Sequence, residues 1–257
     1  MDLDGKTVLI TGGSRGIGQC LARRLGSEGS NVVVNFKKNA DAAARTVDEV
    51  VAAGGRAAAV QADMAEPDQV AALVKGAVEA FGKIDVVVAN AAASAFKPLS
   101  EIRHHHVEKT MAITLQGFLD LVQGSLPHMP RGGRILAVSG WDSFRMLPGH
   151  GLLGAAKAAL ESMIKYLALE LGAAGVTAVG LSPGPIDTDS FRTYAGDQWD
   201  AYERNWLALT PEGRFTTPEE IAEVMAFFCS PRSAAINGQT VVVDGGVSLA
   251  TMPRQPS

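Results

Sequence analysis

A glycine-rich stretch near the N-terminus constrains the fold of this 257-residue chain more than any other feature. Residues 11–18 read TGGSRGIG, follow the apolar run 7–10 and lead into a helical pattern from about Cys20. Glycines allow a tight turn and a close approach to a pyrophosphate, which the free N–H groups of a helix N-terminus then stabilise. The spacing Gly-x3-Gly-x-Gly differs from the Gly-x-Gly-x2-Gly dehydrogenase fingerprint. The order of strand, glycine turn and helix still predicts dinucleotide binding.

Apolar, strand-like runs alternate with helical patterns through the rest of the chain, which is typical of a parallel sheet with crossover helices. The predicted strands cover residues 7–10, 31–34, 56–60, 84–89, 134–138, 176–181 and 241–243. The predicted helices after the glycine turn cover about residues 41–53, 67–81, 101–113, 115–126 and 154–171, with another starting at the capping box 217–220. We find no internal linker, so we expect one domain over residues 1–257. Its fold class is α/β, with a Rossmann-like, doubly wound, seven-stranded parallel sheet.

Composition bounds the classes of function. A hydrophobic content of 47% supports a sizeable core, yet no stretch is long and apolar enough to span a membrane. A strand within the first ten residues leaves no room for a signal peptide. Cys20 and Cys229 lie far apart in helical patterns and are expected as buried fillers, not as a disulfide. With a net charge of −4 we expect a cytoplasmic protein without nucleic-acid or membrane partners.

Positive residues cluster where the adenosine ribose of a dinucleotide is expected. Arg15 lies in the glycine turn, and Lys37 and Lys38 follow the second predicted strand. An acidic residue at that strand end favours a free 2′-hydroxyl, but the position is predicted to be Asn35. The pattern therefore favours NADPH over NADH. The alternative is that Lys37 and Lys38 form a solvated turn.

The ordered motifs of the chain resemble those of the short-chain dehydrogenase/reductase family over nearly the whole length. They are the glycine turn, Asp63, Asn90-Ala91-Ala92, Lys157, Pro183-Gly184 with Thr188, and Asp244-Gly245-Gly246. The resemblance implies that Asp63 contacts adenine, that Asn90 lines the cofactor pocket, and that Ile186 and Thr188 lie against the nicotinamide. Within the family, Asn90-Ala91-Ala92 and Pro185-Ile186-Asp187-Thr188 look most like type III enoyl-thioester reductases. The expected cofactor-binding residues are Gly12, Ser14, Arg15, Gly16, Ile17, Gly18, Lys37, Lys38, Asp63, Met64, Asn90, Lys157, Pro183, Gly184, Ile186 and Thr188.

The chain departs from the family's usual Asn, Ser, Tyr and Lys catalytic set. The tyrosine position, four residues before Lys157, is Leu153; the serine position is Gly140 and the asparagine position is Thr114. Enoyl reductases of the family place their tyrosine seven residues before the lysine, and His150 stands there. Neither of these two positions therefore holds a tyrosine.

The missing tyrosine leaves the source of a proton open, because hydride addition to a ketone builds charge on oxygen. His150 is one candidate acid, since an imidazole titrates near neutrality; its alternative is a loop histidine without a chemical role. Ser139 is another, as a hydrogen-bond donor or as a serine that satisfies backbone. The third is the substrate itself, for instance a phenol beside the carbonyl, with hydride delivery set by positioning. Lys157 is expected to hold the nicotinamide ribose and to supply positive charge.

Aromatic residues gather in the segment that covers the substrate in this family, here a lid over about residues 189–216. Flat side chains suit a flat polycyclic ligand, although Tyr202 and Trp206 also have the spacing of ordinary helix packing. The expected substrate-binding residues are Trp141, Phe144, Met146, Phe191, Tyr194, Trp199, Tyr202 and Trp206.

The resulting hypothesis is an NAD(P)H-dependent ketoreductase acting on a polycyclic aromatic polyketide, angucyclinone-like and from antibiotic biosynthesis. The alternatives are an enoyl-thioester reductase using His150 and a non-catalytic NADPH-binding sensor or partner protein. We expect no metal site, because the consecutive residues His104, His105 and His106 of a helix point in different directions. The family resemblance implies a homotetramer.

Overall fold

One parallel sheet of seven strands forms the centre of the molecule, which confirms the predicted fold class. The computed structural model describes residues 3–188, 191–192, 196 and 199–250. The strand order is β3-β2-β1-β4-β5-β6-β7, so the direction of winding reverses between β1 and β4. Ligands of such sheets bind outside the carboxyl ends of the strands at this switch point. The strands are β1 (Thr7–Ile10), β2 (Asn31–Phe36), β3 (Arg56–Gln61), β4 (Val86–Ala89), β5 (Arg134–Val138), β6 (Thr177–Pro183) and β7 (Thr240–Val243).

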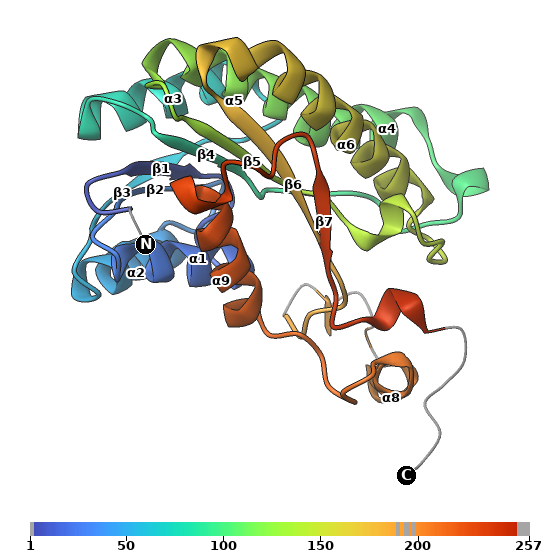
Figure 1. The fold of residues 1–257 in the computed structure, drawn as a ribbon. Coiled ribbons are helices and arrows are strands. Elements are labelled where there is room, and N and C mark those ends of the chain that lie inside the picture. The colour runs from blue at the N-terminus through green and yellow to red at the C-terminus, as the bar shows by residue number, and fades with distance from the viewer. Residues whose placement is uncertain (1–2, 189–190, 193–195, 197–198, 251–257) are drawn as a thin grey trace.

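Helices cover both faces of the sheet (Figure 1). One face carries α3 (Pro67–Phe81), α4 (His104–Met111), α5 (Gly117–Ser125) and α6 (Gly151–Leu171), and the other carries α1 (Gly16–Gly26), α2 (Ala40–Ala52) and α9 (Pro218–Cys229). The helix α8 (Trp199–Leu209) lies apart from both layers, beyond β6 and β7 (Figure 1). It falls within the segment predicted as a substrate lid.

The central strands supply residues to the cores on both faces. In β1, Val8 and Ile10 belong to the core shared with α1 and α9, whereas Leu9 belongs to the core under α3 and α5. Each of these three side chains is fully buried. Successive side chains of a strand point to opposite faces, so a strand covered on both sides has no polar alternation. Burying each such side chain stabilises the fold by roughly 1.5–3 kcal/mol.

Two helix boundaries differ from the prediction. The stretch predicted as two helices is continuous from α4 through a π-helical segment, Ala112–Gln116, into α5. At its end a Cβ on Gly117 would lie 2.2 Å from the Met64 carbonyl oxygen, so the chain there packs directly on backbone. The helix α6 begins at Gly151, three residues before the predicted start, because residues 151–153 continue the helical pattern. His150 is therefore the N-cap residue of α6.

The expectation of two buried cysteines is confirmed for Cys229 and only in part for Cys20. Cys229 is buried and Cys20 half-buried, and both are free thiols. In the described part of the chain, no helix is both long and apolar enough to cross a membrane. Across the same residues, no three His, Cys, Asp or Glu side chains come together as metal ligands would. His104 instead lies 3.1 Å from Glu108, one helical turn along α4.

Candidate active site

The glycine turn has the geometry that a pyrophosphate requires. Gly12 and Gly16 have φ values of +64° and +54°, and a Cβ on Gly18 would lie 2.4 Å from the Gly12 carbonyl oxygen. Only glycine fits this turn without displacing backbone. The helix α1 starts at Gly16 with no acidic side chain in its first turn, so its N-terminus presents N–H groups and no competing charge. The turn therefore fits the pyrophosphate of a dinucleotide.

The turn is held in place from β4. The side-chain amide of Asn90 donates to the carbonyl oxygens of Thr11 at 3.0 Å and Gly12 at 3.2 Å. In return, the Thr11 hydroxyl oxygen accepts from the backbone N–H groups of Asn90 and Ala91, each at 3.0 Å. Asn90 thus braces the cradle, and its predicted contact with the cofactor stays a prediction.

Asn35, which the sequence pattern placed at the strand end nearest the ribose, is buried within β2. Its side chain is 2% exposed, accepts from the Gly12 N–H at 3.2 Å, and donates to the carbonyl oxygens of Val60 and Ala62. The reason for the difference is that β2 continues to Phe36, so the strand ends two residues later than predicted. Asn35 therefore ties the glycine turn to β2 and β3, and Lys37 is the first residue beyond the strand.

The positive residues expected near the ribose have separate environments. Lys37 forms an ion pair with Asp63, the predicted adenine contact. Partial burial opposes ionisation of Asp63, but hydrogen bonds from Lys37 and the Ala65 N–H outweigh it and hold its pKa below the usual range. Arg15 and Lys38 are exposed to solvent. Their expected contact with a 2′-phosphate stays a prediction.

Lys157 is a buried residue of α6, and its expected contact with the nicotinamide ribose stays a prediction. Its side chain is 4% exposed, and Nζ donates to the Val138 carbonyl oxygen at 2.6 Å. Burial lowers the pKa of Lys157 to about 8, although the carboxylates of Asp142 and Glu161 act in the opposite direction. Lys157 and Thr114 line one small cavity, so the structure brings together the family's lysine and asparagine positions. The cavity is lined by Thr11, Met64, Ala89, Ala91, Ile113, Thr114, Phe118, Lys157 and Leu160.

A carboxylate that sequence reasoning missed lies beside His150. Asp142 belongs to the short turn η4 (Trp141–Ser143), and its Oδ2 lies 3.2 Å from His150 Nδ1. Both side chains are largely buried, and the imidazole ring centroid lies 4.7 Å from that of Phe96. Nothing in the spacing singles out Asp142, because its contact depends on how β5 meets α6. The one available signal is the glycine at position 140, where the family has serine.

Ser139 points toward α6. Its hydroxyl donates to Glu161 at 2.5 Å, and Ser143 donates to the same carboxylate oxygen at 2.7 Å. Its predicted role as a proton donor stays a prediction, and the structure gives its proton another acceptor. Glu161 was not anticipated from the sequence.

Aromatic residues of the lid and of the turn after β5 form a connected wall. Trp141 packs on Trp206 with ring centroids 5.2 Å apart, Trp206 continues to Tyr202 at 6.0 Å, and Phe191 lies 5.4 Å from Tyr202. Trp199 lies 5.8 Å from Phe191, and Phe144 lies 6.2 Å from Trp141.

The wall borders an apolar groove. The groove has a volume of about 240 Å³ and is lined by Leu147, Pro148, Tyr202, Asn205, Trp206 and Leu209. That volume lies just below the usual range of small-molecule sites, roughly 300–1,000 Å³. Trp206 is 8% exposed and packs as a core residue, while Tyr202 faces the groove. Met146 is 82% exposed, and Tyr194 lies outside the described residues.

Asp244 anchors one end of this wall. The indole N–H of Trp141 donates to Asp244 Oδ2 at 3.0 Å, and the same carboxylate accepts from the backbone N–H groups of Gly246 and Ser248. Partial burial opposes ionisation of Asp244, but these hydrogen bonds outweigh it and keep its pKa below the usual range. The turn after β5 and the turn after β7 are thereby fastened together beside the groove.

Comparisons with known proteins agree with this geometry. Residues 12–248 match the protein family described as Enoyl-(Acyl carrier protein) reductase. The chain belongs to the short-chain dehydrogenase/reductase family. A 1-cyclohexenylcarbonyl-CoA reductase of Streptomyces collinus is 41% identical over 245 residues, covering 95% of this chain and 88% of the relative.

Two solved structures with the same fold contain NADP. A short-chain dehydrogenase from Burkholderia cenocepacia in complex with NADP has a TM-score of 0.89 at 33% identity, covering 96% of this chain and 100% of that one. The angucycline C-6 ketoreductase LanV with bound NADP has a TM-score of 0.90 at 32% identity, covering 97% and 98%. Similar proteins therefore include both an enoyl-thioester reductase and a ketoreductase.

Proposed function

We propose that this short-chain reductase is an NADPH-dependent ketoreductase whose substrate is a polycyclic aromatic ketone. The observation that carries the proposal is the aromatic wall from Trp141 through Trp206 and Tyr202, which borders an apolar groove. Flat rings gain large contact areas and favourable stacking against such a wall. The likeness to the angucycline ketoreductase LanV supports a substrate of this class.

The residues around the cradle fit NADPH. The N–H groups of the glycine turn and of the first turn of α1 would hold the pyrophosphate, and Arg15 and Lys38 would meet the 2′-phosphate. Lys37 already pairs with Asp63, so it would contribute to the phosphate site as part of that ion pair. Bound NADPH would supply the hydride. The residues Ser14, Ile17, Met64, Pro183, Gly184, Ile186 and Thr188 complete the proposed cofactor site.

The proton is best supplied by the substrate. Leu153 and Gly140 replace the family's tyrosine and serine, and the Ser139 hydroxyl donates to Glu161. A phenol beside the carbonyl can pass its proton to the new alkoxide, while the enzyme contributes alignment and the positive charge of Lys157. In its lost tyrosine and aromatic lid the chain is similar to the atypical angucyclinone ketoreductase of simocyclinone biosynthesis.

A second candidate function is reduction of an enoyl thioester with His150 as the acid. Two observations favour it: the His150–Asp142 pair, and the 41% identity to 1-cyclohexenylcarbonyl-CoA reductase. A third reading, an NADPH-binding sensor without turnover, rests on the incomplete catalytic set.

One experiment separates the three. Purified protein is mixed with NADPH and, in parallel, with polyphenolic ketones and with cyclohexenylcarbonyl-CoA, and products are identified by mass spectrometry. A new alcohol supports the ketoreductase, a saturated thioester supports the enoyl reductase, and NADPH binding without oxidation by any compound supports the sensor. Absence of binding by NADPH and NADH alike would exclude all three.

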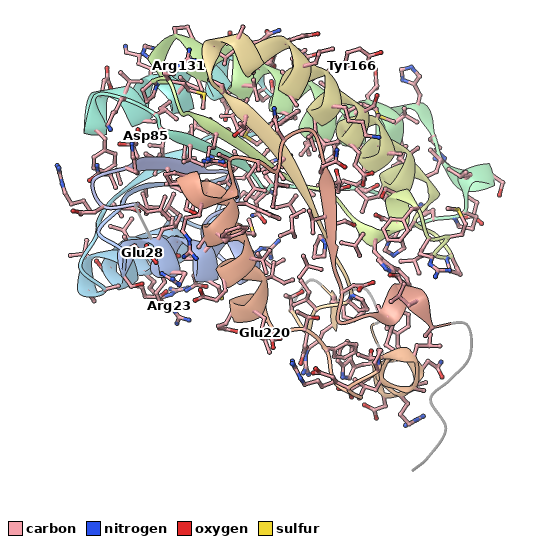
Figure 2. All side chains as sticks on the ribbon, viewed as in Figure 1. Arg23, Glu28, Asp85, Arg131, Tyr166 and Glu220 are labelled. Carbon is pink, nitrogen blue, oxygen red and sulfur yellow. The ribbon has the colours of Figure 1, made fainter. Side chains whose placement is uncertain are left out.

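We also propose a homotetrameric assembly. Tyr166 and Leu169 on α6 are 64% and 80% exposed, and Figure 2 shows Tyr166 on the side of α6 that faces away from the sheet. Large exposed side chains on one helix are typical of surfaces that associate. Light scattering of the purified protein tests this, and a monomer at micromolar concentration would contradict it.

A further inference from the structure

Asp142 lies between two contacts, one made by its own carboxylate and one made by the residue before it. Its Oδ2 lies 3.2 Å from His150 Nδ1, at the N-terminus of α6. Its neighbour Trp141 is held by Asp244 at 3.0 Å, on the turn after β7. The side chain of Asp142 is 6% exposed, so it is a buried group with a defined orientation.

Two glycines make room for Asp142. A Cβ on Gly140 would lie 2.3 Å from Asp142 Oδ1, and a Cβ on Gly154 would lie 2.4 Å from the Asp142 carbonyl oxygen. Real Cβ atoms do not come within 3.0 Å of such atoms. The family's usual set has serine at position 140. Because a side chain there would clash with the Asp142 carboxylate, the absence of the serine and the burial of the carboxylate depend on each other.

Asp142 also acts on the buried lysine. The charged and titratable groups that face it are His150 and Lys157 on α6, with Glu161 one turn further along the same helix. Asp244 lies on the other side, behind Trp141. A Cβ on Gly140 would lie 2.3 Å from Asp142 Oδ1 and 3.5 Å from Lys157 Cγ, so the carboxylate and the lysine side chain flank the same point. A nearby opposite charge favours the charged form of a buried group, so the Asp142 carboxylate opposes the effect of burial on Lys157.

We propose that Asp142 is a positioning residue of the active site. Its carboxylate holds the imidazole of His150 in the Nδ1–H tautomer and keeps Lys157 positively charged, in place of the orientation that the missing serine gives in the family. The inference concerns the site of the proposed ketoreductase and rests on that function for its effect on turnover. Its electrostatic part can be measured without substrate.

The test uses Asp142→Asn, which keeps the shape of the side chain and removes its charge, and Asp142→Ala, which also removes the acceptor. Titration of the Lys157 side chain by nuclear magnetic resonance is expected to give about 8 in the wild type. In Asp142→Asn the midpoint is expected to fall by about one unit or more. Long-range ¹⁵N spectra, with His150→Gln to assign the signal, are expected to show the Nδ1–H tautomer in the wild type and its loss in Asp142→Ala.

A second variant that displaces the Asp142 carboxylate and a matched control variant complete the design. Gly140→Ala should displace the carboxylate and reproduce the tautomer change, whereas Gly172→Ala, whose Cβ meets nothing within 4 Å, should leave both signals unchanged.

The outcomes separate the two proposals. If Lys157 titrates identically in Asp142→Asn and the wild type, or if His150 keeps its tautomer in Asp142→Ala, the positioning role is wrong. If both signals change as expected but no ketone is reduced by the wild type, the proposed function fails while the positioning role stands. If ketones are reduced, the pH above which turnover falls is expected to move downward in Asp142→Asn by the same interval as the Lys157 midpoint.

Discussion

Returning a serine to position 140 is expected to damage this protein, although the family's usual catalytic set has serine there. A Cβ at this position would lie 2.3 Å from Asp142 Oδ1, against a limit of 3.0 Å for real contacts. The carboxylate must therefore move by at least the difference, 3.0 − 2.3 = 0.7 Å. Because the clash is with the end of a side chain, Asp142 can turn away, and we expect this movement to carry Oδ2 away from His150.

The size of the effect follows from that lost contact. The Nδ1–Oδ2 distance is already 3.2 Å, so a shift of this size removes the hydrogen bond. Hydrogen bonds that involve a charged group contribute roughly 1.5–3 kcal/mol. We expect Gly140→Ser to lower the free energy of unfolding by about this amount. By contrast, Gly154→Ala would press on the Asp142 backbone carbonyl oxygen at 2.4 Å and is expected to cost more.

Urea denaturation of the wild type, Gly140→Ser, Asp142→Ala and the double variant measures this directly. In the double variant no carboxylate opposes the new side chain, so its stability should equal that of Asp142→Ala within about 0.5 kcal/mol. Additive losses in the double variant, or wild-type stability and turnover in Gly140→Ser, would refute the reasoning.

Further predictions concern Lys157, the proposed 2′-phosphate site, the side chain of Asn35 that links the glycine turn to β3, and the aromatic wall. Because burial lowers the pKa of Lys157 to about 8, its charge is present below that pH and is lost above it, so kcat should fall as the pH rises through about 8 and not as it falls from 8 to 6. Lys38→Glu should raise KM for NADPH by about tenfold or more and leave KM for NADH nearly unchanged in steady-state assays, because only NADPH carries the 2′-phosphate; equal effects on both would contradict the site. Asn35→Ala should lower the free energy of unfolding by about 2–4 kcal/mol in urea, since it removes the partner of the Gly12 N–H and of the Val60 and Ala62 carbonyl oxygens; a loss under 1 kcal/mol would count against this role of Asn35. Trp206→Ala should destabilise by about 3–5 kcal/mol and raise KM for aromatic ketones more than for NADPH; an unchanged KM would remove Trp206 from the substrate wall.

The sequence was sufficient for the parts of the molecule that local patterns determine. Apolar runs separated by helical patterns predicted all seven strands. The glycine turn with its flanking strand and helix predicted the cradle that the structure shows at Gly12 and Gly16. These features depend on periodicity and backbone conformation, which are visible in neighbouring residues.

Other parts depend on contacts between distant segments. The extension of β2 by two residues buries Asn35 and moves the strand end to Phe36, and only pairing with β3 determines where that strand stops. The pairing of Asp142 with His150 depends on the early start of α6, which places the histidine at the N-cap. The ion pair of Lys37 with Asp63 joins two strand ends that no spacing rule connects.

The hydrogen bond from Trp141 to Asp244 has a consequence for how substrates are chosen. Swinging this indole aside to admit a bulkier ketone would break its hydrogen bond to Asp244, whose carboxylate cannot follow because two backbone N–H groups hold it, so this end of the aromatic wall resists remodelling. Adaptation to new ring systems should instead proceed through α8, where Tyr202 and Leu209 can change without disturbing the sheet. A library that randomises the α8 positions should therefore shift ketone preference while keeping the fold, whereas one centred on Trp141 should mostly lose stability.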